Sequence, residues 1–342
     1  MKKTVATIIT EKILNRMSEI ERKIENGDAD ATAFRWVKPF AHGAPDRAYS
    51  YETLKAYRGI NRLLLDNNEY LTYRRMQDLN KNIDSPQYQI RKGAKSDIVC
   101  FYTTKTLQDD ETNEPLIDEK TGEEIQKKIL RYYNVFSRED IIRRDTGESL
   151  PSKFAFEHYS HDEITEQVRV ALDRFNRLFN YYCKKYGIEL EIIKDGTQAY
   201  FSHDMKIRVP EMSNFSSVYL WVATLAHEMG HSTGMFLGRF NDEESKDIER
   251  AMQDYSREEL IAEICAQIIA SEMQIPDDSE LPDNAVAYIH SWSAFLKDRP
   301  GEILVAAAKA EKAAELIMEC LREMEREKKE SQKEETEKEG DR

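Results

Sequence analysis

The chain has 342 residues, which is enough for two domains, and 40% of them are hydrophobic, which is enough to form buried cores. The net charge of −14 argues against a protein coated in nucleic acid, but residues 1–110 carry 19 Lys/Arg against 15 Asp/Glu, so the front is the better surface for such a contact. No apolar run approaches the roughly 20 residues of a membrane span, and four scattered cysteines without a Cys-x-x-Cys pair indicate a reduced, cytoplasmic protein with no membrane association.

Residues 1–140 are predicted to form a mixed α/β domain. The basic start passes directly into an amphipathic pattern, which predicts a helix and not a secretory signal. Charged residues fill 108–128, so this segment is predicted to be an exposed hairpin or an acidic insert between two strands. The predicted elements are a helix over 8–26, a helix or turn-helix over 49–65, a helix over 71–81, and strands over 97–102 and 129–136.

Aromatic residues of this front domain are interleaved with lysine and arginine. Flat rings can stack on unpaired bases, and cations can contact phosphates, a combination that suits a single nucleic-acid strand. Most aromatic residues of any domain lie in its core, however, so the pattern alone leaves both interpretations open.

Residues 161–324 are predicted to form a mainly helical domain with a small sheet. The segment before it, 141–160, contains Asp, Gly, Ser and Pro and predicts a linker; the segment after it, 325–342, is rich in Glu and Lys and predicts a charged tail, either a solvated helix extension or a disordered one. The last predicted strand, 206–210, is either an edge strand that pairs with an extended substrate peptide or a plain structural strand. The predicted elements begin with a helix over 161–186, a strand over 190–193 and strands over 199–202 and 206–210.

The sequence His227-Glu228-Met229-Gly230-His231 follows the pattern His-Glu-x-x-His inside an apolar run. On a helix, His227 and His231 share one face, and two imidazoles at that spacing can bind one divalent ion, usually zinc. Glu228 lies beside them, where it can accept a proton from the attacking water. Apolar residues at helical spacing predict that this helix is buried. Two histidines satisfied inside an ordinary core helix are the alternative, but without a metal such a buried set leaves costly polar groups unpaired.

A third ligand is expected from the later stretch 255–266. Glu259 and Glu263 lie four residues apart on one helix face, while leucine and isoleucine cover the other sides, so the helix is predicted to be buried. Buried carboxylates need a metal or a partner, and the alternative is a solvated acidic face. Tyr255, one turn earlier, is either a donor to an oxyanion or a packing residue.

These two stretches resemble the glutamate zincins, or gluzincins, in which a Glu-x-x-x-Asp/Glu helix supplies the third metal ligand and a carboxylate that orients a histidine. By that resemblance Glu259 binds the metal and Glu263 orients a histidine ligand, with Glu258 as the neighbouring alternative to Glu259. The resemblance implies a metallopeptidase that depends on Zn2+ or another divalent metal.

Several short motifs, taken in order along nearly the whole chain, resemble the ArdC-type antirestriction proteins. The front motifs are Trp36-Val37-Lys38-Pro39, Tyr57-Arg58-Gly59-Ile60-Asn61, Arg91-Lys92-Gly93 and Tyr133-Asn134-Val135-Phe136. The back motifs are the His-Glu-x-x-His stretch, Tyr255 to Glu263 and Tyr288-Ile289-His290-Ser291-Trp292. The acidic insert and the long Glu/Lys tail depart from the pattern of that family.

The resemblance implies an α+β chain in which an N-terminal domain that binds single-stranded DNA precedes a mainly helical, zincin-like metallopeptidase domain. It further implies a protein of a mobile element that protects incoming single-stranded DNA from host restriction, with that DNA and a protein substrate as partners. The DNA-binding residues that it carries over are Trp36, Lys38, Tyr57, Arg58, Asn61, Arg91, Lys92 and Lys95.

Two other functions fit the same residues. In one, the zincin fold is only a scaffold within a single-strand-binding protein, although the presence of the whole set His227, Glu228, His231 and Glu259 argues against a lost site. In the other, the peptidase cleaves a repressor protein and thereby regulates the mobile element.

Overall fold

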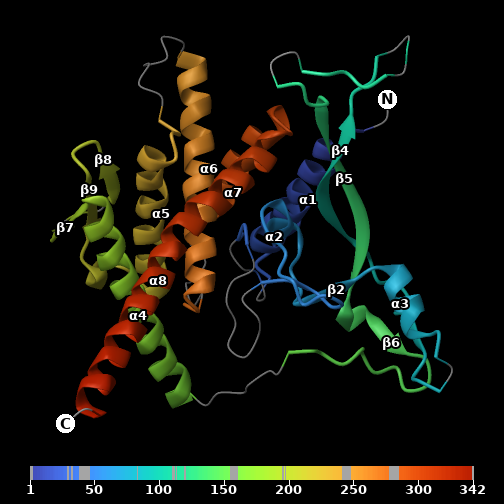
Figure 1. Cartoon of the computed structure of the whole chain (residues 1–342), viewed down its shortest axis with the longest axis horizontal. Helices are drawn as coiled ribbons and strands as arrows, with labels where there is room; N and C mark the ends of the chain where they lie inside the picture. The colour runs from blue at the N-terminus through green and yellow to red at the C-terminus, as the bar shows by residue number, and fades with distance from the viewer. Residues whose placement is uncertain are drawn as a thin grey trace.

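The computed structural model of the chain shows two halves, one dominated by strands and one by helices (Figure 1). Lys38, a predicted DNA contact, lies outside the described residues, as do the side chains at 161–164, 248–254, 285, 288 and 331–340. The described residues are 3–28, 31, 34–37, 47–82, 84–109, 112, 114–118, 121–154, 161–194, 196, 198–240, 248–276 and 285–340.

The front half is built on one long antiparallel ribbon. Its elements are α1 (Val5–Glu25), β1 (Tyr49–Ser50), α2 (Ile60–Leu64), β2 (Glu69–Leu71), α3 (Tyr73–Leu79), β3 (Tyr88–Ile90), β4 (Asp97–Thr106), β5 (Gln126–Ser137), the 3₁₀ helix η1 (Arg138–Asp140) and β6 (Ile141–Arg143). Strands β4 and β5 form the ribbon, and β2 and β1 extend it in the order β1-β2-β5-β4. A separate pair joins β3 to β6.

The back half is a group of helices with one small sheet (Figure 1). Its elements are α4 (His161–Tyr186), β7 (Glu189–Ile193), β8 (Tyr200–Ser202), β9 (Lys206–Pro210), the 3₁₀ helix η2 (Met212–Asn214), α5 (Val218–Phe236), α6 (Ile248–Glu272), α7 (Ala285–Asp298) and α8 (Glu302–Gly340). The α+β prediction is confirmed. Within the described part of the chain, every helix is too short or too polar to traverse a lipid bilayer.

Two predicted segments of the front half differ from the structure. The helix or turn-helix predicted over 49–65 is correct only for α2, because β1 pairs with β2 at the start of this segment. The linker predicted over 141–160 begins with β6, and Ile141 is fully buried. The polar residues that resembled a linker form the turn after β6, where Arg143 N–H donates to the Glu148 carbonyl at 2.8 Å.

Two predicted strand positions also need correction. Residues 206–210, considered as an edge strand, form β9, which lies in the centre of its sheet between β7 and β8. The edge next to α5 is therefore β8. In the front half, β5 begins at Gln126 and β4 extends to Thr106, so the ribbon includes part of the segment predicted as an insert over 108–128.

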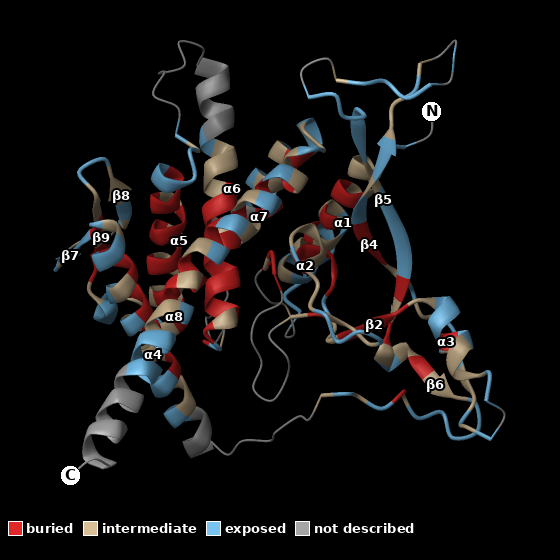
Figure 2. Ribbon diagram, viewed as in Figure 1, coloured by how far each residue is buried: buried red, intermediate tan, exposed pale blue. Residues whose placement is uncertain are grey.

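One hydrophobic core joins the two halves (Figure 2). Ile9 and Met17 of α1 belong to the same cluster of buried residues as Leu225 of α5 and Ala310 of α8. The apolar spacing that predicted the first helix therefore describes a face that packs against the back half. Since burial of such faces is the main source of stability, the front and back halves stabilise each other.

Ion pairs surround this shared core. Arg62 is 5% exposed, and its guanidinium lies 2.5 Å from a carboxylate oxygen of Glu272 and 3.4 Å from one of Glu311. Arg58, nearby but exposed, pairs with Glu315 of α8 at 2.7 Å. A buried arginine must be paired to be tolerated, so Arg62 fixes how α2 sits against α6 and α8.

Asn61 covers the open edge of β4. Its amide nitrogen donates to the Cys100 carbonyl at 2.9 Å, and its amide oxygen accepts the Cys100 N–H at 2.7 Å. The unpaired backbone groups of an edge strand can pair with another chain, and the Asn61 side chain occupies two of them. Beyond this point the ribbon is exposed on both sides (Figure 2).

Candidate metal centre

Helix α5 carries the His-Glu-x-x-His sequence through the buried centre of the back half. Ser217 caps the helix, because its hydroxyl accepts the Leu220 N–H at 3.2 Å. Gly238, with a φ of +61°, allows the chain to turn away just after the last residue of the helix. Gly234, which the sequence offered as the end of this helix, lies inside it, and the helix continues to Phe236.

Helix α6 approaches α5 very closely at Gly230, in the middle of the motif. A Cβ atom on Gly230 would lie 3.1 Å from the Ala262 Cα and 3.4 Å from the Ala262 carbonyl oxygen. A glycine facing an alanine lets the two backbones meet, since no side chain intervenes. The approach brings Glu259, which lies on α6 next to this contact, against the histidines of α5.

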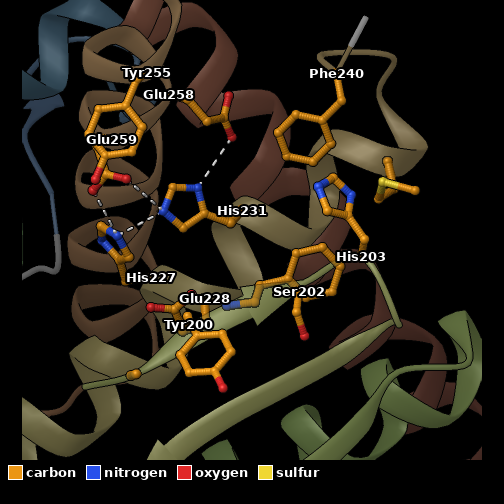
Figure 3. Close-up of a pocket in the computed structure, with 13 residues that line it drawn as sticks. Tyr200, Ser202, His203, His227, Glu228, His231, Phe240, Tyr255, Glu258 and Glu259 are labelled. Atoms are coloured by element: carbon orange, nitrogen blue, oxygen red, sulfur yellow. Dashed lines mark hydrogen bonds and ion pairs between the residues drawn. The ribbon is translucent and has the colours of Figure 1, made fainter. Parts of the chain in front are cut away.

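Three potential ligand atoms converge between the two helices (Figure 3). The Nε2 atoms of His227 and His231 lie 3.0 Å apart. One oxygen of Glu259 lies 3.5 Å from His227 Nε2, and the other lies 3.4 Å from His231 Nε2. Among the residues described, these three side chains form a group whose ligand atoms all lie within 4.8 Å of one another.

These separations fit a single divalent ion. Tetrahedral bonds of about 2.0–2.2 Å to histidine nitrogen and carboxylate oxygen place ligand atoms about 3.3–3.5 Å apart. The two Nε2 atoms, 3.0 Å apart, are close to that separation, and each of them has a different oxygen of Glu259 at 3.4 or 3.5 Å. Two imidazoles and one carboxylate also leave a fourth position open, as catalytic zinc sites do.

A carboxylate lies behind each histidine. Glu263 has an oxygen 3.4 Å from His227 Nδ1, and Glu258 has an oxygen 3.5 Å from His231 Nδ1. An acceptor at Nδ1 selects the tautomer that leaves Nε2 free for a metal. Glu258, the sequence-based alternative for the third ligand, therefore lies behind His231, whereas Glu259 faces the ligand group.

Arg239 belongs to the site but was not found by sequence analysis. Its guanidinium donates to both oxygens of Glu258, at 3.0 and 2.7 Å, and to the Gly230 carbonyl at 2.7 Å. Burial opposes the charge of Glu258, but hydrogen bonds from His231 and Arg239 outweigh it and lower the pKa of this carboxyl. Arg239 lies in a polar segment after α5, where no periodic pattern marks it.

Glu228 is held at the edge of the small sheet. It is 6% exposed, and one of its oxygens accepts the Phe201 N–H of β8 at 2.7 Å. Burial raises the pKa of Glu228, although the neighbouring histidines act in the opposite direction. A carboxylate whose pKa lies closer to neutrality is a better general base at neutral pH.

Two pockets, of about 450 and 400 Å³, form a cleft across the site and share Ala199, His227 and Glu228. The first is bordered by β8. The second has both polar and apolar walls, and Arg35 of the front half also lines it. Both halves therefore contribute to the cleft. Tyr255 also lines the first pocket, and Gln267 lines the second.

Tyr255 lies at the mouth of the first pocket, beside Glu259 (Figure 3). Its side chain is 68% exposed, so the interpretation of Tyr255 as a packing residue is wrong. The charge of Glu259, followed by partial burial, raises the pKa of Tyr255, which keeps its hydroxyl protonated and able to donate.

Known domains match the chain in the order of its two halves. The N-terminal domain of anti-restriction factor ArdC matches residues 6–136, and a zincin-like metallopeptidase domain matches residues 180–309. The metal-free crystal structure of the antirestriction ArdC protein from the R388 plasmid is similar, with a TM-score of 0.57 and 26% identity over 93% of this chain and 98% of that one. The chain therefore combines an ArdC N-terminal domain with a zincin-like metallopeptidase domain. The Mn(II)-bound structure of the R388 protein is similar as well, with a TM-score of 0.55 and 26% identity over the same shares of both chains.

Other relatives of this chain differ in length. Two DNA primases TraC of Escherichia coli are 28% and 26% identical to it, over 83% and 87% of this chain. The chain spans only 18% and 26% of the length of these two primases. The uncharacterized protein y4eC of Sinorhizobium fredii is 26% identical over 87% of this chain and 88% of its own length.

Of the DNA contacts carried over from the ArdC resemblance, Trp36 needs correction. It is 1% exposed, and its ring packs edge-on against Phe34 and Trp292, with centroids 4.9 and 5.8 Å away. A ring enclosed in this way offers no face to a base. Trp36 is a core residue that joins the front half to α7.

The other carried-over residues fall into two groups. Members of the first group contact other parts of the protein. Tyr57 is partly buried next to Tyr133, and Arg91 donates to the Glu139 carbonyl at 3.1 Å. Arg58 and Asn61 make the contacts described above. Lys92 and Lys95 are exposed just before β4, where a phosphate can reach them.

Metal affinity is expected to fall as the pH is lowered. Burial lowers the pKa of His227, but hydrogen bonds to Glu259 and Glu263 outweigh it and raise that pKa from 6.5 to about 10 in the metal-free protein. This charged pairing stabilises the metal-free fold fully below pH 6.5 and less as the pH rises through about 10. A metal must displace the proton, so affinity is expected to drop about tenfold per pH unit for each proton released. Calorimetry in buffers of different ionisation enthalpy would measure that release, and an affinity independent of pH between 6 and 8 would contradict the prediction.

Gly230→Ala is expected to separate α5 from α6 and weaken metal binding. Overpacking costs about 1–3 kcal/mol, and the better helix propensity of alanine offsets about 1 kcal/mol of that, so the net loss of unfolding free energy is about 0–2 kcal/mol. Gly301→Ala is the matched control, because a Cβ there meets no atom within 4 Å. Chelator competition and urea unfolding of both variants would test this. Equal metal affinity in the two variants would show that the close approach does not set the ligand geometry.

Proposed function

We propose that the chain is an antirestriction-type protein of a mobile element that hydrolyses peptide bonds at a zinc ion held by His227, His231 and Glu259. The observation that supports this most is the convergence of the three ligand atoms between α5 and α6. The second support is Glu228, a buried carboxylate that adjoins this group and opens into the cleft. Two histidines and one glutamate are a donor set typical of catalytic zinc.

The ion supplies Lewis acidity, which polarises a carbonyl and lowers the pKa of water. Glu228 accepts a proton as the water oxygen bonds to the carbonyl carbon, and it returns that proton to the amide nitrogen as the C–N bond breaks. The Phe201 N–H keeps one Glu228 oxygen fixed while the other is available for this transfer. The Tyr255 hydroxyl donates to the carbonyl oxygen as charge develops there.

The substrate lies along β8 as an extended segment. An edge strand can pair with a peptide through its main chain, and β8 is the edge that borders the first pocket. Side chains on either side of the cleaved bond enter the two pockets, which lie on opposite sides of Glu228 and His227.

We propose that the front half binds single-stranded DNA along the β4–β5 ribbon. Tyr102 is 62% exposed and Tyr132 is 41% exposed on one face of the ribbon, and the rings of Phe101 and Tyr133 lie 5.6 Å apart on the other. Within the described chain, no carboxylate pairs with the exposed cations of the ribbon, which are Lys105, Lys127, Lys128 and Arg131. Exposed rings beside such cations are the features that bind unpaired bases and phosphates.

The two alternative functions remain open to experiment. A non-catalytic scaffold would bind DNA and metal without cleaving any peptide. A regulatory peptidase would cleave one partner protein, such as a repressor, and would not depend on the aromatic ribbon for that cleavage.

Glu228→Gln is expected to leave metal binding intact and to reduce hydrolysis by about 100- to 10,000-fold, because it removes the general base. The zinc-loaded protein would be incubated with a mixture of cellular peptides, and new peptide termini would be counted by mass spectrometry. Zinc content of wild type and variant provides the control. If the zinc-loaded wild type produces no new termini, the proposal of a peptidase that cleaves extended peptides in general is wrong, and the scaffold or the peptidase for one partner protein replaces it.

Tyr102→Ala and Tyr132→Ala are each expected to weaken binding of single-stranded DNA by about 5- to 150-fold, the equivalent of about 1–3 kcal/mol per stacked base. Tyr73→Ala is the matched control, since Tyr73 is 51% exposed on α3 and lies off the ribbon. Fluorescence anisotropy with single- and double-stranded oligonucleotides at several salt concentrations would measure the effect, and affinity should fall with salt. Equal losses in all three variants would place the DNA elsewhere.

A further inference from the structure

A buried glutamine links the metal centre to the front half. The Gln267 side-chain oxygen accepts the main-chain N–H groups of Trp36 at 2.7 Å and Val37 at 3.3 Å. Its side-chain nitrogen donates to one oxygen of Glu263 at 2.9 Å. The other oxygen of Glu263 lies 3.4 Å from His227 Nδ1. Two front-half residues and three residues of α5 and α6 thus form a continuous hydrogen-bonded chain that ends at the proposed metal ligand His227.

The donors at one end fix the direction of this chain. Main-chain N–H groups can only donate, so the carbonyl oxygen of Gln267 must face them and its NH2 group must face Glu263. A carboxylate that accepts this N–H on one oxygen is oriented with its second oxygen toward His227. The front half therefore determines which way the Gln267 amide points, and the amide in turn orients Glu263.

We propose that Gln267 is a positioning residue for the metal ligand His227. Residues 36 and 37 of the front half complete the metal centre, because their N–H groups orient the Gln267 amide. This inference rests on the proposed metal site. It extends that site from the back half alone to a unit to which both halves contribute. Partners that orient the carboxylate behind a histidine ligand influence metal affinity, since they fix both the ring and its tautomer.

The surroundings favour positioning over simple space filling. Gln267 is 6% exposed, and Trp36 and Val37 are 1% and 3% exposed, so all three contacts lie in the core, away from solvent. Arg35, between Phe34 and Trp36, lines the second pocket together with Gln267 and Glu263. The same short segment therefore forms a wall of the cleft and holds the amide.

Zinc affinity of the full-length protein, measured by competition with a chromophoric chelator, tests the proposal. Gln267→Glu keeps the size of the side chain but sets a carboxylate against Glu263, and it is expected to weaken zinc binding by about 10- to 100-fold. Gln267→Met keeps the volume and removes both hydrogen-bonding groups, so it is expected to weaken binding by about tenfold.

A double variant separates positioning from packing. Combining Glu263→Gln with Gln267→Glu exchanges the amide and the carboxylate. The carboxylate then accepts from the N–H groups of residues 36 and 37 and from the new amide, whose own oxygen faces His227. Zinc affinity is expected to recover above that of Gln267→Glu alone, a coupling that a space-filling role would not produce.

Ser271→Ala is the matched control, because Ser271 lies one turn further along α6 and is 2% exposed. It should bind zinc as the wild type does, and circular dichroism should show all variants folded without metal. If Gln267→Glu does not fold, Gln267→Met and the double variant make the same comparison. If the wild type binds zinc and both single variants bind it equally well, the positioning role is wrong while the metal centre stands. If the wild type does not bind zinc, the metal centre itself is wrong.

Discussion

The contact between Gly230 and Ala262 is the constraint on which the candidate site depends. Two helices that meet without intervening side chains hold their flanking residues at a fixed spacing, and here those residues are His227 and His231 on α5 and Glu259 on α6. Carboxylates behind the histidines then fix the rings, and Arg239 fixes one of these carboxylates. The close approach of the two backbones thus determines how α5 packs against α6, which tautomer each histidine adopts and how far apart the ligand atoms lie.

Much of the back half could be predicted because its signals are local. Apolar residues at helical spacing and a capping serine mark α5, and its motif places both histidines on one face. The acidic pair of α6 indicated the third ligand because its other faces are apolar. The roles of Glu258 and Arg239 could not be predicted, since they depend on how a loop without periodic pattern returns to the helix.

The front half was harder to predict because its decisive contacts are distant in sequence. The composition around Trp36 is typical both of a residue that stacks on bases and of a core residue. Only the packing of Trp292 against the Trp36 ring shows that it is a core residue. The resemblance similarly implies that Asn61 contacts DNA. Only its hydrogen bond with the Cys100 N–H shows that it covers a strand edge. Both strands of the ribbon were predicted, but the exposure of Tyr132 and Tyr133 was not, because alternating residues usually mark a strand with one buried face.

The core shared between α1 and the helices of the back half has an evolutionary consequence. A gene break between the two halves would expose the apolar face of α1 and the surface of α7 that covers it, and such surfaces promote aggregation. Selection should therefore keep both halves on one reading frame, and recombination should move them as a single cassette. The alignment of 83% and 87% of this chain with portions of two much longer TraC primases is what such joint inheritance would leave behind.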